Sequence, residues 1–599
     1  MIRSVFLSGV AGLAVAAMPA AAQRTDDNAV KTAEDAFGTS VGDEQIGIYN
    51  PNLVRGFSPV AAGNVRLEGL YFDQQANPTQ RLVGGTTVHV GISAQGYPFP
   101  APTGIADYQV RRPGAKALAS IDMSLGPWAS KGLEADVQLP LDGERMGLAL
   151  GIGRYTDSQP HHSTSDLTSL AAIGRFKPSD DIEILPFWSR VRVRDEESAT
   201  LIFTTGDFLP PRVPRDRFLG QKWSDFSGAT SNYGLIAKAD VAGFDLSLGV
   251  FRSILAVTED HIDLLFGTDE TGRVANRVVV ADGNNRYAST SGEVRVARSF
   301  VDGARRHKLI LSLRGRDQNR RFGGAGLAQL GESQIGIQDF RPEQRPDIGA
   351  KTQDEVRQTT LALGYEGRWS HVGELSLGVQ KTDYTKAITD PDPTVVFPKS
   401  TAAPWLFSGT GAIYLSPKIA AYAGYTRGLE ESPVAPVEAV NRNEAPPAIR
   451  TLQKEAGLRW KMSEGVSAVI GVFDIEKPYF NLDGAGRFRQ LGQVRNRGVE
   501  FSVAGPVAKG LYLVAGNVWL DATVSGEEVA SGAIGRRPIG TFRRHSIASL
   551  DYQIPGVAPL SINAGFEATS ARTANAKDSL RIPARAVLHL GGRYRFKVA

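Results

Sequence analysis

The chain has 599 residues, of which 42% are hydrophobic, and a formal net charge of only +4. Acidic and basic side chains are dispersed among one another, so the sequence lacks the basic patches of a nucleic-acid-binding protein, and we expect no nucleic acid as a partner. It contains no cysteine, which excludes a disulfide framework as the source of its stability.

The first 22 residues have the composition of a secretory signal peptide. Arg3 supplies a positive charge, an apolar run follows from 5 to 17, and the small residues of 19–22 form an A-x-A cleavage site. The apolar run is shorter than the roughly 20 residues that a membrane-spanning helix needs. We therefore expect residues 1–22 to be a signal peptide and the polar, aperiodic residues 23–40 to form a flexible periplasmic tail.

The next stretch, residues 41–112, differs in composition from everything that follows it. Gly, Pro, Asn and Gln are frequent, and short mixed strands such as 64–72 are separated by irregular segments. The segment 96–104 carries several prolines, which remove backbone donors and fix φ, so it is neither helix nor central strand. This composition predicts a small globular unit with many loops.

From about Ala115 to the end, short segments alternate apolar and polar residues with a period of two. The clearest is 133–139, in which the leucines, alanine and valine share one face of a strand and the acids and amide share the other. Many such segments are joined in pairs by tight turns, as 235–241 and 244–250 are joined through Ala242 and Gly243. Repeated apolar and polar faces behind an export signal are typical of a barrel with lipid outside and a polar interior.

Two classes of connection alternate along this region. Tight turns alternate with long polar loops at about 198–230, 315–357, 384–404 and 428–450, which is the arrangement of outer-membrane barrels. Aromatic residues also fall near strand ends, as interfacial girdles require: Trp369, Tyr414, Tyr422, Tyr425, Trp460, Tyr512, Trp519 and Tyr594. A propeller or tandem sandwiches would also alternate, but no motif recurs at a constant period.

The predicted fold is therefore all-β. Residues 113–599 are expected to form a large transmembrane antiparallel β-barrel of about 22 strands in the bacterial outer membrane. A barrel of that width encloses a lumen that is either open or plugged. The small unit with many loops, residues 41–112, precedes this barrel in the chain.

Short motifs stand in a specific order at 52–57 and 65–73, at 96–108 and around 497–501. In this order they resemble TonB-dependent outer-membrane receptors of the ferric-siderophore type. Residues 52–57, with Arg55 and Gly56, followed by 65–73, look like the "RG" element and strand of the family's plug. Residues 96–108 resemble the exit from plug to barrel, and the late segments around 497–501 read like successive barrel strands. The resemblance implies that residues 41–112 are a small plug domain inside the lumen, shortened relative to the family's usual plug.

The resemblance implies a function and partners. It implies uptake of a ferric siderophore or a similar scarce ligand, driven by a TonB-type energising protein at the periplasmic side. The nearest candidate for the segment that binds this protein is 28–32. Arg55 and Gly56 are implied to make a plug–barrel contact that holds the plug reversibly, and the alternative is an ordinary surface turn.

The long segments 203–223 and 316–346 are rich in arginine and aromatic residues. A guanidinium group offers a planar fork to oxygen anions and stacks on rings, so these segments are candidates for a ligand vestibule. The predicted vestibule residues are Tyr97, Phe99, Arg212, Arg215, Arg217, Trp223, Arg320, Arg321 and Phe322. The alternative is that these loops contact lipopolysaccharide phosphates, outer-membrane lipid or solvent.

The sequence carries no recognisable catalytic constellation. The glycines of 323–326 lack the lysine and hydroxyl residue of a phosphate loop, and the adjacent His161 and His162 would point to opposite sides of an extended segment. We expect a protein that is not an enzyme and that has no cofactor or metal. The alternatives to a gated receptor are a passive wide channel and a non-transporting surface binding protein.

Overall fold

The computed structural model describes residues 7–9, 27–198, 200–557 and 559–596. The predicted signal peptide, apart from 7–9, and the first residues of the predicted tail lie outside this part of the chain. Leu7–Gly9 forms a short strand, β1, which pairs antiparallel with β8.

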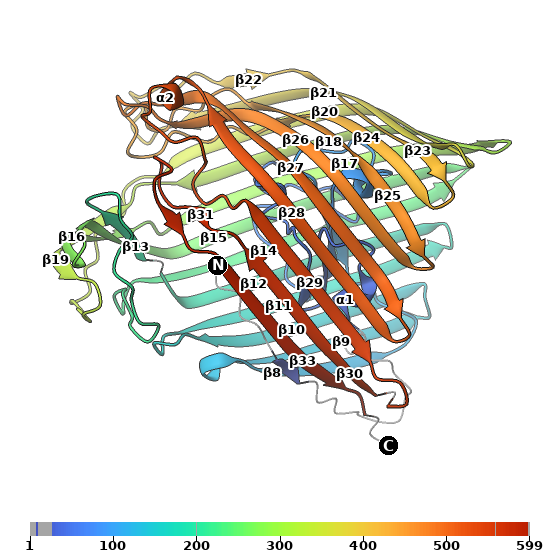
Figure 1. Cartoon of the computed structure of the whole chain (residues 1–599), viewed down its shortest axis with the longest axis horizontal. Helices are drawn as coiled ribbons and strands as arrows, with labels where there is room; N and C mark the ends of the chain where they lie inside the picture. Colours follow the sequence, from blue (N-terminus) through green and yellow to red (C-terminus); the bar gives the residue numbers. More distant parts are fainter. Residues whose placement is uncertain (1–6, 10–26, 199, 558, 597–599) are drawn as a thin grey trace.

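The chain forms a 25-stranded sheet in which each wall strand pairs antiparallel with the next, and β33 lies beside β8 (Figure 1). Five of these strands lie at its margins: β1, β13 (Thr200–Thr204), β16 (Arg273–Ala281), β19 (Gly326–Gln334) and β22 (Ser400–Ala402). The other twenty make the wall: β8 (Leu118–Leu125), β9 (Lys131–Asp142), β10 (Met146–Ser158), β11 (Thr164–Ser179), β12 (Ile182–Glu197), β14 (Asp225–Val241), β15 (Phe244–Thr268), β17 (Asn285–Asp302), β18 (Arg305–Phe322), β20 (Thr352–Trp369), β21 (Gly373–Thr389), β23 (Trp405–Ser416), β24 (Ile419–Glu430), β25 (Ile449–Ser463), β26 (Val466–Leu482), β27 (Phe488–Ala508), β28 (Leu511–Ser525), β29 (Arg544–Gln553), β30 (Leu560–Thr569) and β33 (Arg585–Tyr594). The predicted large antiparallel barrel is confirmed.

The alternation of the sequence becomes the two faces of this wall. In β8 each apolar side chain from Ala119 to Leu125 is exposed on the outside, while Ser120, Asp122 and Ser124 between them are half-buried on the lumen side. Leu133 of β9 is 52% exposed on the outer surface. Tyr422 departs from the predicted aromatic girdle, because it is buried in the lumen.

The long connections are partly strands rather than loops. The hairpin of β17 and β18 extends to Phe322, so residues 316–322 belong to the wall strand and not to a loop as predicted. Beyond the end of the wall, β13 and β16 pair with the far half of β15, and β19 pairs with β16. Their apolar residues come in runs, such as Val278–Val280 of β16, and not at every second position, which hides the period of two. In Figure 1 they project together at the left.

A second, six-stranded sheet fills the lumen, in the order β3-β2-β6-β7-β4-β5 (Figure 1). Its strands β4 and β7 are parallel, and the other pairs are antiparallel. Its elements are α1 (Ala29–Thr32), β2 (Thr39–Val41), β3 (Glu44–Ile46), β4 (Val65–Leu67), β5 (Leu70–Tyr71), β6 (Val83–His89), the 3₁₀ turn η1 (Gly91–Ala94) and β7 (Ile105–Val110). This sheet is the predicted plug. The remaining short elements are η2 (Pro127–Ala129), α2 (Glu527–Ala530), β31 (Arg572–Thr573) and β32 (Arg581–Ile582).

The prediction that residues 23–40 form a flexible tail is wrong for 27–40. Asn28 caps α1 by accepting a hydrogen bond from the amide of Lys31, and Ala29, Val30 and Phe37 are buried. The polar composition misled the prediction because the polar groups find partners on the barrel wall. The side-chain amide of Asn28, for example, donates to Asp551 of β29 at 2.9 Å.

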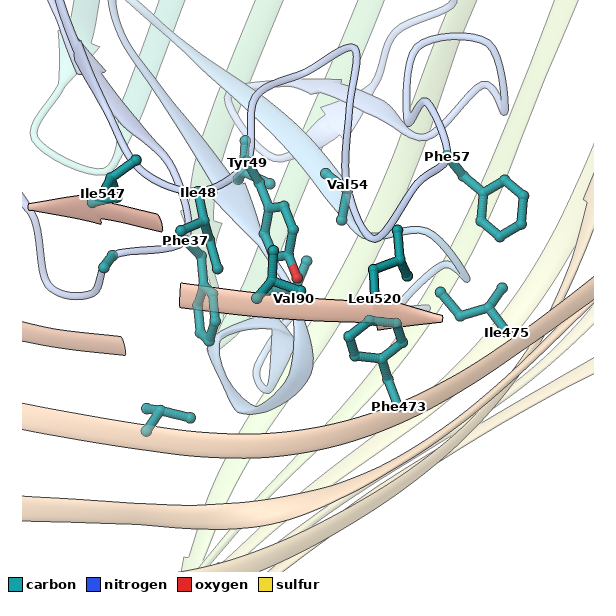
Figure 2. Packing of buried hydrophobic residues seen from close by; sticks show 14 of the residues in the cluster. Phe37, Ile48, Tyr49, Val54, Phe57, Val90, Phe473, Ile475, Leu520 and Ile547 are labelled. Carbon is teal, nitrogen blue, oxygen red and sulfur yellow. The ribbon is translucent and has the colours of Figure 1, made fainter. Parts of the chain in front are cut away.

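Two apolar seams join the plug to the wall. In the first, Phe37, Tyr49 and Val54 of the plug pack with Phe473 and Leu520 of the wall (Figure 2). In the second, plug residues around Phe72 pack against Phe187 of β12 and Phe251 of β15. Burial of this apolar surface is the main non-directional force that holds the plug in place.

Among the described residues, no helix has the length and apolar character needed to cross a membrane.

Candidate functional site

The side chain of Arg55 links the plug to two strands of the wall. It lies in a tight plug turn and is 1% exposed. Its Nη1 donates to Oε2 of Glu455 on β25 at 2.7 Å, its Nε donates to Oε2 of Glu500 on β27 at 3.1 Å, and its Nη2 also donates to Glu500. The guanidinium carbon lies 4.6 Å from the centre of the Phe473 ring. We call Arg55, Glu455 and Glu500 the plug latch.

The turn that presents Arg55 requires glycine at the next position. Gly56 has φ +83°, and a Cβ there would collide with the side-chain amide of Asn496 on β27. That same amide donates to the backbone carbonyl oxygen of Arg55 at 2.9 Å. The plug backbone therefore approaches the wall too closely for any side chain, which gives the Arg-Gly pair a physical reason.

The charges of the latch stabilise one another. Burial alone would lower the pKa of Arg55, but Glu500 and Glu455 outweigh it and hold that pKa well above its ordinary value. Tyr49 donates to Glu500 at 2.7 Å, and burial together with Glu500 raises the pKa of Tyr49. The group is a buried charged network in which each member depends on the others.

The carboxyl group of Asp35 predicts that plug docking depends on pH. Burial, together with the charges of Glu34 and Glu500, raises the pKa of Asp35 to about 7 despite the amide of Phe37 that donates to it. A raised carboxyl pKa means that the folded state binds the proton more tightly than the unfolded state, so stability falls as pH rises from about 4 to 7. We expect Asp35→Asn to hold the plug more firmly than wild type at pH 8 and equally at pH 4. Urea midpoints of plug release measure this difference, and Asp240→Asn, which removes an exposed wall carboxylate, is the control. Equal midpoints of Asp35→Asn and wild type at pH 8 would contradict the prediction.

A small cavity lies above the plug on the side of the long loops. Phe99, Pro100 and Pro102 of the plug form one side of it, and Arg314 and Gln380 of the wall form the other. The Nη2 of Arg314 donates to Gln380 at 2.7 Å. The plug side of this cavity is therefore largely apolar, and its wall side offers hydrogen-bonding and cationic groups.

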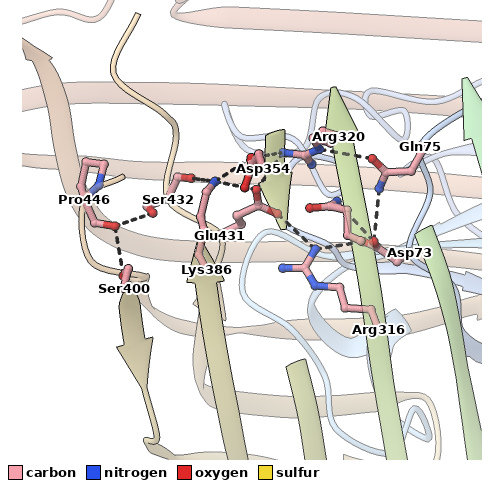
Figure 3. Close-up of polar contacts among 11 residues, drawn as sticks. Asp73, Gln75, Arg316, Arg320, Asp354, Lys386, Ser400, Glu431, Ser432 and Pro446 are labelled. Carbon is pink, nitrogen blue, oxygen red and sulfur yellow. Dashed lines mark hydrogen bonds and ion pairs between the residues drawn. The ribbon is translucent and has the colours of Figure 1, made fainter. Parts of the chain in front are cut away.

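Beside this cavity a network of ion pairs joins the plug, the wall and a long loop (Figure 3). Arg316 of β18 pairs with Asp73 of the plug at 3.0 Å and with Glu431 at 3.3 Å. Arg320 pairs with Glu431 at 2.7 Å, and Lys386 of β21 pairs with Glu431 at 2.9 Å. Asp354 of β20 lies 3.3 Å from Lys386. Three cations thus converge on the carboxylate of Glu431, the first residue after β24.

The predicted vestibule residues do not form a single surface. Arg320 lies in the network just described and its Nε donates to Gln75 of the plug at 3.4 Å. Arg321 is exposed, and the alternation of β18 turns it to the opposite face. Phe322, the last residue of that strand, is half-buried.

The two predicted vestibule residues that lie in the plug make contacts with other protein groups. Phe99 is buried and packs with Ala297, Ile310 and Ala362 of the wall, so it anchors the plug at the edge of the cavity. Tyr97 donates to Asp107 within the plug, and burial together with Asp107 raises the pKa of Tyr97.

The remaining predicted residues lie in the connection between β13 and β14. Arg212, Arg215 and Arg217 are exposed there. Trp223 is half-buried and its Nε1 donates to the carbonyl oxygen of Arg341 at 3.1 Å. This connection is thereby tied to residues after β19, away from the plug.

Sequence reasoning missed most of the acidic partners in both sites. Glu500 belongs to a recognised strand opening, but nothing in the sequence indicates that it meets Arg55, which lies 445 residues away. Arg314, Arg316 and Arg320 do carry a signal, because an even spacing on a strand places them on one face. Recognising 316–322 as strand instead of loop would have revealed that face.

A closed antiparallel barrel with its apolar face outward and a folded plug in its lumen defines an outer-membrane protein of the plugged type. A family model described as the TonB dependent receptor-like β-barrel matches residues 194–599. The chain belongs to this family, which places it in the bacterial outer membrane.

Solved structures confirm the fold. The ferric preacinetobactin receptor BauA of Acinetobacter baumannii superposes with a TM-score of 0.75 at 17% identity, covering 91% of this chain and 83% of that one. The ferric-catecholate import receptor Fiu of Escherichia coli K12 gives a TM-score of 0.76 at 12% identity, covering 91% of this chain and 84% of that one. At these identities the likeness is one of architecture.

A curated relative is similar in sequence over part of the chain. The ferrichrome receptor FcuA of Yersinia enterocolitica is 26% identical over 183 residues, which are 30% of this chain and 24% of that receptor. The matched stretch therefore spans about a quarter of the relative's length.

Proposed function

We propose that this chain is an outer-membrane receptor that takes up a ferric siderophore or a similar scarce ligand, with a TonB-type protein supplying energy from the periplasmic side. The observation that carries the proposal is the latch: a folded plug closes the lumen and is held by a buried ion pair. A barrel that stays blocked could not serve as a passive channel. A buried ion pair, in contrast to a covalent link, can be broken and made again. The family and the ferric-siderophore receptors that share the fold support this proposal.

Two measurements test the proposed function. A deletion strain under iron limitation should lose growth on at least one ferric siderophore and regain it when the gene is restored. Unchanged growth on every ferric siderophore tested would contradict siderophore uptake. In planar bilayers the purified protein should show no steady conductance, and a large steady conductance without a partner would favour the passive channel.

The segment that an energising partner would reach is docked in the described structure. The ammonium group of Lys31 pairs with Asp551 of β29 at 2.9 Å and lies 5.6 Å from the ring of Tyr512. Together with the bond from Asn28, this holds residues 28–32 against the wall, so engagement by a periplasmic protein requires their release.

We expect Asp551→Asn to release this segment. A hydrogen bond to a charged group contributes about 1.5–3 kcal/mol, so trypsin should cut after Lys31 about tenfold faster in the variant than in wild type. Asp240→Asn, which removes an exposed carboxylate near a short turn of the wall, should leave the cleavage rate unchanged. Equal rates in wild type and Asp551→Asn would show that other contacts hold the segment.

A further inference from the structure

Cations outnumber carboxylates where the plug meets β17 and β18. Arg66 of the plug and Arg314 of the wall flank the ring of Tyr71, at 5.4 Å and 5.3 Å from its centre. Neither has a carboxylate of its own: Arg66 donates to the carbonyl oxygen of Val65, and Arg314 donates to Gln380. Burial and the neighbouring charge of Arg314 lower the pKa of Arg66 to about 10.

The acids in this region already have cationic partners. Glu293 accepts from Arg295 at 2.7 Å and from the hydroxyl of Ser312 at 2.7 Å, and Asp73 pairs with Arg316. The side of the lumen that runs from Arg320 through Arg316 to Arg314 therefore carries a surplus of positive charge next to the cavity. A surplus of buried cations favours an anion at this place.

The anion that lies among these cations is the carboxylate of Glu431, which belongs to a loop and not to a wall strand. Burial would raise its pKa, but Arg320, Arg316 and Lys386 outweigh burial and hold the pKa of Glu431 at about 2. Near its start, the loop 431–448 that carries it is held by Ser432, whose carbonyl oxygen accepts from Lys386 at 2.9 Å and whose hydroxyl donates to Pro446 at 2.6 Å. Farther along, Asn441 and Asn443 tie the loop to other segments through their side-chain amides. Figure 3 shows this loop crossing to the cations of the wall.

We propose that Glu431 is a displaceable internal anion, and that a negatively charged ferric complex replaces its carboxylate at Arg316, Arg320 and Lys386 and thereby frees the start of the loop 431–448. This inference rests on the proposed function and narrows its ligand class. Arg316 also pairs with Asp73, so the same exchange weakens a contact that holds the plug. Charge-assisted bonds to arginine forks suit the oxygen anions of catecholate or carboxylate ligands.

The charge of the ferric complex provides the test. A ferric tris-catecholate carries net negative charge, whereas a ferric trihydroxamate can be neutral. We use the ferric complex of 2,3-dihydroxybenzoate and a neutral ferric trihydroxamate as probes, and measure binding to the purified full-length mature protein by quenching of its tryptophan fluorescence. Glu431→Gln keeps the shape of the side chain and removes the competing charge.

Glu431→Gln should bind the catecholate complex about tenfold more tightly than wild type and bind the trihydroxamate unchanged. Arg320→Gln, at a position that is only partly buried, should weaken the catecholate by a similar factor. Glu343→Gln is the matched control, because Glu343 is a loop carboxylate that pairs with Arg345 at an exposed site.

The outcomes separate the inference from the proposed function. Equal changes for both probes, or weaker catecholate binding by Glu431→Gln, overturn the inference and leave siderophore uptake standing. If wild type binds the trihydroxamate and not the catecholate, the inference is likewise overturned and siderophore uptake still stands. Binding of neither probe, together with unchanged growth of the deletion strain on every ferric siderophore, overturns the proposed function itself.

Discussion

Replacing Arg55 with glutamine should detach the plug while leaving the barrel folded. The variant keeps a hydrogen-bonding side chain but leaves Glu455 and Glu500, both 5% exposed or less, without their cation. Breaking a buried pair by removing one partner costs about 3–5 kcal/mol, which exceeds what the remaining hydrogen bonds of the turn restore. In planar bilayers the variant should show steady conductance where wild type is closed.

The barrel provides an internal control for this experiment. Its strands pair with one another around the whole wall, so the heat-modifiable migration of the barrel should not change in Arg55→Gln. Arg212→Gln, which removes a guanidinium from an exposed loop, should behave as wild type in both measurements. A closed, non-conducting Arg55→Gln variant would show that apolar packing alone holds the plug.

Replacing Phe72 with alanine should loosen the plug at its second seam. Phe72 is 1% exposed and meets Phe251 of β15 edge-on, with ring centres 5.7 Å apart. Truncating a buried phenylalanine costs about 3–5 kcal/mol, because both the transfer free energy and the packing around the cavity are lost. The urea midpoint of plug release should fall accordingly, measured by a fluorescent label on the plug.

Phe176→Ala is the matched control for this variant. Phe176 is 44% exposed on the outer face of β11, so its truncation removes no plug contact. If Phe72→Ala and Phe176→Ala release the plug at the same urea concentration, the seam around Phe72 does not hold the plug.

The wall could be predicted from the sequence because the pattern that defines each of its strands lies within a few consecutive residues. A lipid-facing side chain and a lumen-facing side chain alternate along every strand, and segments such as 133–139 carry that alternation in full. The turn at Ala242 and Gly243 was also predicted from the sequence. In the structure both residues have positive φ, +53° for Ala242 and +77° for Gly243. The strands beyond the membrane, such as β16 and β19, lack a lipid face, and the period of two was lost there.

The sites could be predicted only in part because they join residues that are distant in sequence. Arg55 was recognisable from its motif, but its partners are 400 and 445 residues away. Composition misjudged residues 27–40, since polar side chains such as Lys31 are neutralised by wall residues that no local pattern reveals. The contacts of Glu431 could not be predicted from the residues around it, because they are made with three cations from two other strands.

The order of strands in the plug sheet sets how the plug responds to mechanical force. The two N-terminal strands, β3 and β2, form one edge of the sheet, and β2 is joined to β6 through only three residue pairs, from Thr39 to Val41. A pull on the N-terminus should therefore peel these strands one ladder at a time, and the next attachments along the chain are Tyr49 and Arg55, which both donate to Glu500. The strands β4 and β5 lie at the opposite edge of the sheet, near Phe72, so we expect the pulling force to reach them last. Traction from the periplasm would thus open one side of the lumen while the other side stays closed.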